Sequence, residues 1–343
     1  MFSAPRVDVE MLGPAAWYVY ILTTLLALAG FLMLSKLMEK FPGQDLIYVF
    51  KKVFGNVAGS ILSFLIGIAF FITSMVFLRL FTEAVKVYVY PLTSPSFIMI
   101  FFISAVLVML YLGFETIART AAVFLLPILF GLLIIYILGF PSYKVYNLFP
   151  ILGFGIGRNV TYSIKNISYF GESLSLAVVL SSLQGNKYFR NGGLRGIAIS
   201  GLLTTAALLV YIMAFPYKAA IENTIPSFAF TRIIELGAFF QRFDPIFLFV
   251  WSISAIIATA IFLYSFLSIY CKVFKIDDHR QLVLPLGIIV FCISIIIQDL
   301  STLVLGLLPV YRKYAGIIYF GLPLLALLVA TIRGQKSRPS GSG

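Results

Sequence analysis

The sequence predicts an all-helical protein that crosses a membrane many times. Its 343 residues are 61% hydrophobic and only 11% charged, with a mean hydropathy of +1.04, whereas about a quarter of a typical soluble domain is charged. Apolar runs of about 20 residues, long enough to cross a hydrocarbon core about 30 Å thick, recur along the whole chain. Alternating strands of about 10 residues, as in a membrane β-barrel, are not seen. We therefore predict a single transmembrane bundle of α-helices.

Nine segments meet this length requirement, and the connections between them carry the Gly, Pro, Asn and Asp residues that favour turns. We place the spans at residues 15–37, 59–86, 96–113, 120–140, 162–183, 195–215, 245–271, 282–299 and 314–333.

Two shorter segments have an amphipathic pattern. "QDLIYVFKKVFG", residues 44–55, is apolar at Leu46, Ile47 and Phe50 and places Lys51 beside them. This pattern is typical of a helix that lies on the membrane surface. "IPSFAFTRIIELGAFFQRFDP", residues 225–245, is a second candidate of the same kind.

The charge distribution predicts an orientation. Alternating sides across nine spans places 14 of the 25 Lys and Arg residues on one side and 10 on the other, and assigns Arg79 to neither. The positive-inside rule makes the richer side, with the C-terminus, cytoplasmic, and residue 1 then lies outside. The net charge of +12 favours attraction to anionic membrane lipids over nucleic acid, since the basic residues are scattered over short loops.

The residues that carry most enzyme chemistry are scarce. The positions of Cys271, Cys292 and His279 in the sequence suggest neither a disulfide framework nor a metal-ligand cluster. No paired carboxylates and no nucleophile–base set can be identified either. We expect no enzyme activity, no metal and no cofactor.

The strongest candidate for a functional residue is Glu172, in the segment "NISYFGESLSLAVVL". A carboxylate near the centre of a span costs about 2.5–3.5 kcal/mol to insert, and Gly171 beside it weakens the helix. A break here would free backbone groups to bind a small molecule. The alternative is a kink whose neutral Glu172 bonds a neighbouring helix.

Three other residues are weaker candidates. Arg79 and Glu83 are four apart and therefore share a helix face, in the outer third of a span where an arginine can reach the surface. They can form a structural pair, a gate or a coupling relay. Trp251 can line a pocket.

The order of the spans suggests two inverted repeats, each beginning with a helix that is broken at mid-membrane. The span with Glu172 is followed by four others but preceded by only four. The partner broken helix is therefore expected at the N-terminus, where "MFSAPRVDVEMLGPAAW" carries the helix-breaking run Ser3, Ala4 and Pro5. We expect residues 1–12 to be the remnant of this first helix, 13–140 the rest of the first repeat, 141–334 a loop and the second repeat, and 335–343 a flexible tail.

Several segments also resemble a known family. "LMEKFPGQDLIYVFKKVFG", "LRLFTEAVK", "YNLFPILGFG", "SYFGESLSLAVVLSSL" and "FFQRFDPIFLFVWSISAIIATAIFLYS" are similar, in order and spacing, to the spore germination permease family. This family provides the B subunits of nutrient germinant receptors and belongs to the amino acid/polyamine/organocation superfamily.

The resemblance implies a ten-helix fold of five plus five helices, with an amino-acid-sized ligand between the broken first and sixth helices. It assigns Tyr169, Phe170, Gly171 and Glu172 to the sixth-helix break, and Ser3, Ala4 and Pro5 to the first. It also implies A-type and C-type partner subunits in the spore inner membrane. A proton-coupled amino acid permease and a degenerate, non-binding subunit remain alternatives.

Overall fold

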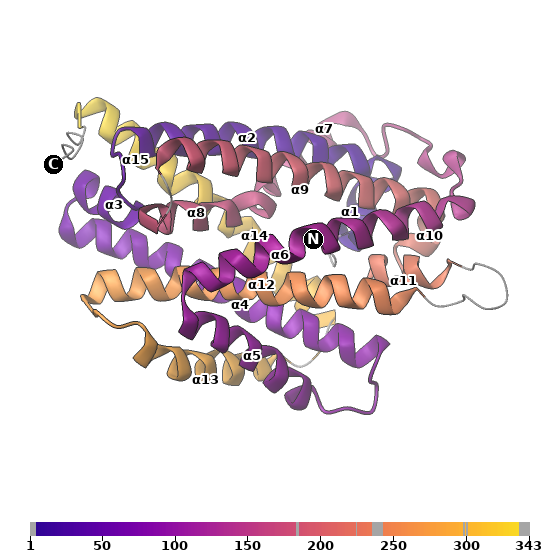
Figure 1. Cartoon of the computed structure of the whole chain (residues 1–343). Coiled ribbons are helices and arrows are strands. Elements are labelled where there is room, and N and C mark those ends of the chain that lie inside the picture. Colours follow the sequence, from indigo (N-terminus) through magenta and orange to yellow (C-terminus); the bar gives the residue numbers. More distant parts are fainter. Residues whose placement is uncertain are drawn as a thin grey trace.

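The computed structural model describes residues 5–335 except 183–184, 224, 235–242, 298 and 300, and only the backbone of Pro5 and Leu305. Within this part of the chain every regular element is a helix. The long helices are α2 Ala16–Glu39, α4 Asn56–Tyr88, α5 Pro95–Leu112, α6 Phe114–Leu138, α9 Asn186–Ala214, α12 Asp244–Phe274 and α13 Arg280–Ile296. The helices α2, α9 and α12 run along the length of the bundle, and α4, α5 and α6 are inclined to them (Figure 1).

The shorter elements connect or complete these helices. They are α1 Pro5–Leu12 with η1 Gly13–Ala15, α3 Leu46–Phe54, α7 Ile156–Lys165, η4 Ile167–Leu174, α8 Ser175–Val178, α10 Tyr217–Ala220, α11 Pro226–Arg232, η6 Thr302–Leu307, α14 Leu308–Gly316, η7 Ile317–Gly321 and α15 Leu322–Ile332, with 3-10 turns η2 Phe140–Ser142, η3 Val145–Leu148 and η5 Leu180–Ser182.

The predicted polytopic helical class is confirmed. Among the described residues, seven helical stretches are long and apolar enough to cross a membrane. Two of the nine predicted spans take other forms. The span predicted at 282–299 is α13, an apolar helix of 17 residues, and the span predicted at 162–183 is the interrupted series α7, η4 and α8.

Three predicted spans begin too late in the sequence. The helical stretches begin at Phe114 rather than 120, at Asn186 rather than 195 and at Thr302 rather than 314, whereas the first predicted span, 15–37, agrees with α2. Charged residues near each start, such as Arg119, Arg190 and Arg312, lower the local hydropathy and caused these errors. The orientation count had placed Arg312 and Lys313 in a loop, whereas they lie within α14.

The helix predicted to lie on the membrane surface is α3, but it is packed into the bundle. Asp45 caps it by accepting a 2.8 Å hydrogen bond from the Tyr48 amide, and Gly55 ends it with a φ of 91° that favours glycine. Its apolar face, including Ile47 and Phe50, is at most 2% exposed, because it packs on α4 and α15. Of the second amphipathic candidate, α11 forms the first part, and residues 235–242 lie outside the described residues.

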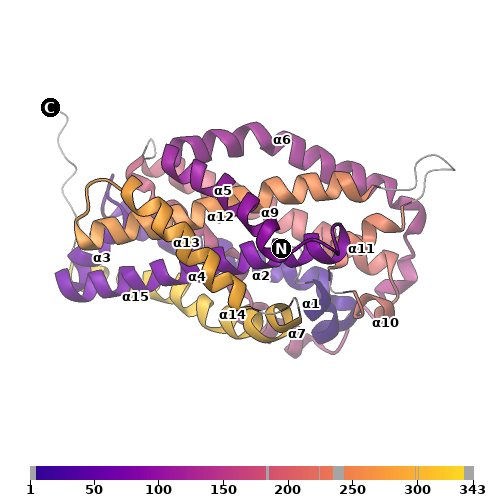
Figure 2. The same ribbon diagram turned by 90° about the horizontal axis from the view of Figure 1, so that it is seen from below.

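Small residues bring the helices of the bundle close together, as is common in membranes. A Cβ added to Gly201 of α9 would lie 2.3 Å from the Thr24 hydroxyl oxygen of α2, and one added to Gly193 would lie 2.0 Å from the Phe31 ring. α4 packs along α12 in the same way, with Gly67 against Ile269. Seen from below, α6 and the α14–α15 segment lie at opposite edges of the bundle (Figure 2).

The interior contains two clusters of buried apolar side chains. The first joins α1, α2, α4, α5, α9, α12 and α13 and contains Phe81 and Trp251. The second joins α2, α3, α4, α8 and α15 and contains Phe170 and Tyr319. The two clusters meet beside the interrupted helix.

Candidate functional site

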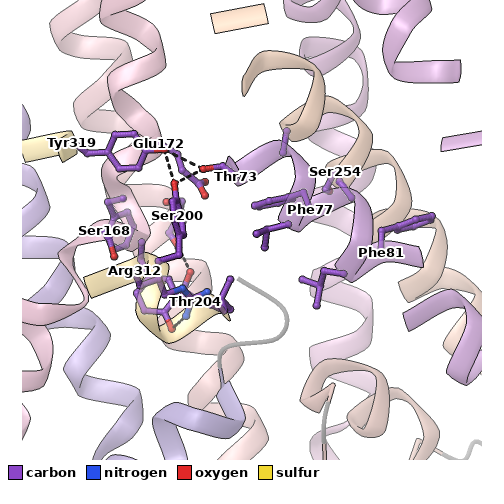
Figure 3. A pocket seen from close by; sticks show the side chains of 18 of the residues that line it. Thr73, Phe77, Phe81, Ser168, Glu172, Ser200, Thr204, Ser254, Arg312 and Tyr319 are labelled. Atoms are coloured by element: carbon purple, nitrogen blue, oxygen red, sulfur yellow. Dashed lines mark hydrogen bonds between the residues drawn. The ribbon is translucent and has the colours of Figure 1, made fainter. Parts of the chain in front are cut away.

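A cavity of about 270 Å³ lies where the two apolar clusters meet (Figure 3). The segment η4 forms one side, and α4, α9, α12 and α14 supply the others near their midpoints. Small-molecule sites usually measure about 300–1,000 Å³. This cavity is therefore sized for a ligand of few atoms.

The interruption of the helix at η4 creates the side of the cavity that carries Glu172. The α-helical turns of α7 end at Lys165, and a 3-10 segment continues to Leu174. Gly171 lies against the ring of Tyr319 so closely that an added Cβ would be 2.3 Å from Tyr319 Cδ2. Such irregular backbone is tolerated at membrane depth when it is enclosed by protein or lines a cavity. Tyr319 belongs to η7, so two irregular segments pack on each other here.

Glu172 lines the cavity and is partly exposed to it. Within the described part of the chain, no side chain or amide donates a hydrogen bond to its carboxylate. Three hydroxyl groups lie beside it and bond to one another: Thr73 Oγ1 is 2.6 Å from the Tyr311 hydroxyl and 3.1 Å from that of Tyr319, and the two tyrosine hydroxyls are 2.9 Å apart. Glu172 therefore presents a carboxylate, next to polar hydroxyls, to whatever occupies the cavity.

Arg312, in α14, lines the same cavity and was missed by the sequence analysis. Its Nη1 donates a hydrogen bond to the Tyr169 hydroxyl, and its guanidinium carbon lies 3.9 Å from the centre of the Tyr169 ring. It forms no ion pair with a carboxylate of the described residues. It is nevertheless close enough to Glu172 to interact with it electrostatically. The cavity thus carries one negative and one positive group that are not joined to each other.

Asp8, in α1, was also missed and is completely buried behind the cavity. Three tyrosine hydroxyls donate to its carboxylate: Tyr20 at 2.7 Å, Tyr162 at 2.6 Å and Tyr169 at 3.3 Å. Tyr169 therefore lies between Asp8 and Arg312, which also attract each other electrostatically. This network ties together α1, α2, α7, η4 and α14.

The other predicted ligand-binding residues fall into two groups. Tyr169, Phe170 and Trp251 line the cavity beside Glu172, whereas Gly171 faces a neighbouring apolar pocket between α2 and η7. Ser3 and Ala4 lie outside the described residues, and Pro5 begins α1, with only its backbone described.

Arg79 and Glu83 do not line the cavity. They form the predicted pair on one face of α4, with Arg79 Nη2 2.7 Å from Glu83 Oε1. Their side chains are only 4% and 5% exposed, so the expectation that Arg79 reaches the surface was wrong. The reason is that α4 lies inside the bundle, between α12, α5 and α13.

One further polar group points to a ligand. Ser168 lines the cavity, is 6% exposed, and has no hydrogen-bond partner for its hydroxyl within the described residues. Leaving such a group unpaired costs about 1–3 kcal/mol. Ser200 and Thr204 of α9 and Ser254 of α12 add hydroxyls to the cavity lining.

Comparisons with known proteins agree with the fold and the sequence motifs. Residues 1–302 match the family described as spore germination protein. The chain is 25% identical to spore germination protein A2 of Bacillus subtilis over 95% of this chain and 88% of that protein. It is 23% identical to spore germination protein KB of the same organism, over 96% and 90% of the two chains, and 22% identical to spore germination protein YndE, over 98% and 93%. The chain is an integral membrane protein and belongs to the spore germination protein family.

Proposed function

We propose that this chain is the transporter-like membrane subunit of a spore germinant receptor, which binds a small nutrient and signals through partner subunits. The nutrient is a neutral amino acid, and its ammonium group binds at Glu172. The observation that carries this proposal is the cavity at the interrupted helix, into which a carboxylate without a hydrogen-bond donor from the described residues projects. Membership of the germination family supports the role in germination.

The chemistry of the cavity suits such a ligand. An ammonium group has three donors and no acceptor, so the Glu172 carboxylate is its natural partner. The Ser168 hydroxyl has no partner within the described residues, and the 3-10 segment η4 lines the cavity in the manner of broken transporter helices. Phe77, Phe81 and Trp251 form an apolar wall that suits an uncharged side chain.

The proposal includes an arrangement in the membrane. We place the C-terminus in the cytoplasm and the chain in the spore inner membrane, with A-type and C-type receptor subunits as partners. The helix α3 and the C-terminus lie at the same end of the bundle (Figure 1), and basic residues of several elements meet there. Lys51 bonds the Lys272 carbonyl, Lys272 pairs with Asp45 at 2.6 Å, and Arg333 bonds the Val53 carbonyl, which supports this orientation.

The interrupted helix also supports the division into inverted repeats. The series α7, η4 and α8 opens the second repeat, residues 141–334, and residues 13–140 form the rest of the first. Asp8 in α1 then faces η4 through Tyr169, as the two broken helices of such repeats do.

The test is equilibrium binding to the purified chain in lipid nanodiscs, screening the twenty standard amino acids with the wild type and with Glu172→Gln. We expect saturable binding of at least one neutral amino acid, weakened about 10- to 100-fold in Glu172→Gln, because a hydrogen bond to a charged group is lost. Glu115→Gln is the matched control, since Glu115 is exposed at the start of α6 and pairs with Arg119. Absence of saturable binding by any of the twenty would contradict the proposal and favour the degenerate subunit.

A second candidate function is the proton-coupled permease. The cavity-facing carboxylate of Glu172 favours it, because a permease needs a group that gains and loses a proton. Uptake into proteoliposomes under a proton gradient separates the two. Binding without uptake supports the receptor, whereas uptake that Glu172→Gln abolishes while binding survives supports the permease.

A further inference from the structure

Arg312 has more hydrogen-bonding capacity than the protein uses. A guanidinium carries five N–H donors, yet Arg312 donates to a single described group, the Tyr169 hydroxyl. The residue is partly buried, and its side chain lines the cavity. A cation in the membrane interior with unused donors is costly unless an anion or another acceptor reaches it.

The surroundings hold Arg312 at the cavity wall without neutralising it by an ion pair. Tyr169 accepts its hydrogen bond on one side and, on the other, donates to Asp8 at 3.3 Å. Tyr20 and Tyr162 donate shorter bonds to the same carboxylate, so Asp8 is fully occupied behind the cavity. Asp8 attracts Arg312 electrostatically but forms no ion pair with it.

Glu172 does not neutralise Arg312 either. Both side chains line the cavity, and no ion pair joins them within the described chain. Figure 3 shows Glu172 beside Thr73, and Arg312 near Thr204. The cavity therefore separates a negative group from a positive group, which complements a small molecule that carries the opposite charges at its two ends.

We propose that Arg312 is the specificity-determining residue that binds the carboxylate of the ligand, and that Asp8 is a positioning residue that acts on it through Tyr169. The inference rests on the proposed function, in which Glu172 is the only charged group that binds the ligand. A carboxylate is the expected partner because the planar guanidinium fork matches its two oxygens. An amine that lacks the carboxylate then binds at Glu172 but leaves the Arg312 donors unused.

The first test needs no variant. L-alanine, L-valine and L-leucine are compared with the matching amines without the carboxylate, ethylamine, 2-methylpropylamine and 3-methylbutylamine, by equilibrium binding to the full chain in nanodiscs. For each amino acid that binds, we expect an affinity about 10- to 100-fold higher than that of its amine, because the charge-assisted bond to Arg312 is made by the amino acid alone.

The second test uses Arg312→Gln. This variant should lose that preference, so that amino acid and amine bind with affinities within a fewfold of each other, while binding of the amine is unchanged. Arg312→Lys keeps the charge without the fork and should retain part of the preference. Lys313→Gln is the matched control, because it removes the adjacent positive charge from an exposed side chain outside the cavity.

A third test addresses the positioning role of Asp8. Asp8→Asn should reduce the preference for the amino acid in the wild-type background and have no effect on it in the Arg312→Gln background. A purely structural Asp8 would instead weaken the amino acid and the amine equally in both backgrounds.

The outcomes separate the two proposals. If the wild type binds amines as tightly as amino acids, or if Arg312→Gln weakens both equally, the carboxylate-binding role of Arg312 is overturned while the proposed function stands. If the wild type binds none of the six compounds, the same comparison is made with the neutral amino acid that binds most tightly in the screen and its decarboxylated amine. If none of the twenty amino acids binds, the role of Arg312 is overturned together with the neutral amino-acid ligand of the proposed function.

Discussion

Two pairs of oppositely charged residues lie inside this bundle, and they differ in whether the two charges contact each other. Arg79 and Glu83 stand one turn apart on the unbroken helix α4, pair at 2.7 Å and are almost fully buried. Glu172 lies in the 3-10 segment η4, and Arg312 lies in α14, between η6 and η7. Both residues line a cavity without pairing with each other. The first pair is closed, because its two charges meet in a direct ion pair, and Arg79 also attracts Asp299. The second pair is open, because its two charges do not meet, and we interpret them as the groups that bind a third molecule.

The contrast shows how an interruption changes the role of charged residues in a membrane helix. On a regular helix, the backbone is satisfied internally and a buried charge needs only a side chain one turn away. In η4 and η7 the regular spacing is lost, and Gly171 packs directly on Tyr319. Glu172, in η4, and Arg312, between η6 and η7, line the cavity beside these segments. We therefore interpret the closed pair as structural and the open pair as functional.

The largest effect is expected from breaking the closed pair. Arg79→Met leaves Glu83 buried without its ion-pair partner, and removing one member of a buried pair costs about 3–5 kcal/mol. We expect a large fall in the thermal unfolding temperature of the purified chain in detergent.

The double variant Arg79→Met, Glu83→Met is the control for this prediction. Replacing both charges with apolar side chains of similar size should recover most of the lost stability, and it should leave ligand binding intact. If the double variant remained as unstable as the single one, the pair would have a role beyond neutralising its own charges.

A smaller effect is expected from filling the close contact at the helix interruption. In Gly171→Ala the new Cβ would lie 2.3 Å from Tyr319 Cδ2, and such overpacking costs about 1–3 kcal/mol. Because η4 must move away from η7, ligand affinity should also fall. Gly196→Ala in α9 is the control, since its Cβ meets no atom within 4 Å, and we expect unchanged binding. Equal behaviour of the two variants in melting and binding assays would count against a shaped cavity wall.

The smallest effect is expected from Ser168→Ala. The Ser168 hydroxyl has no partner within the described residues, so its removal should leave the melting temperature of the ligand-free protein unchanged or slightly raised. Affinity for the amino acid should fall a fewfold to about tenfold, as for a lost neutral hydrogen bond. A lower melting temperature of the ligand-free variant would show instead that the Ser168 hydroxyl stabilises the folded protein.

The same contrast separates what the sequence could and could not predict. The pair of Arg79 and Glu83 was predictable because a spacing of four fixes the geometry on one helix. The interruption at Gly171 and Glu172 was predictable because a glycine and a carboxylate are conspicuous inside an apolar run. Both signals are local.

The residues that were missed depend on distant contacts. Arg312 looked like a loop residue, since Arg312 and Lys313 interrupt the apolar pattern, and only the packing of α14 against η4 brings it to the cavity. Asp8 lay in a short segment without periodicity, and its three tyrosine partners are 12, 154 and 161 residues away. The burial of α3 was missed for the same reason, because its apolar face fits either lipid or protein.

The most direct test of the open pair is an experimental structure of the chain with the tightest-binding amino acid from the screen. We predict the ligand in the central cavity, with its ammonium group within hydrogen-bond distance of the Glu172 carboxylate and its carboxylate at Arg312. A structure in which Glu172 and Arg312 close into a direct ion pair, while the amino acid binds elsewhere, would contradict this interpretation.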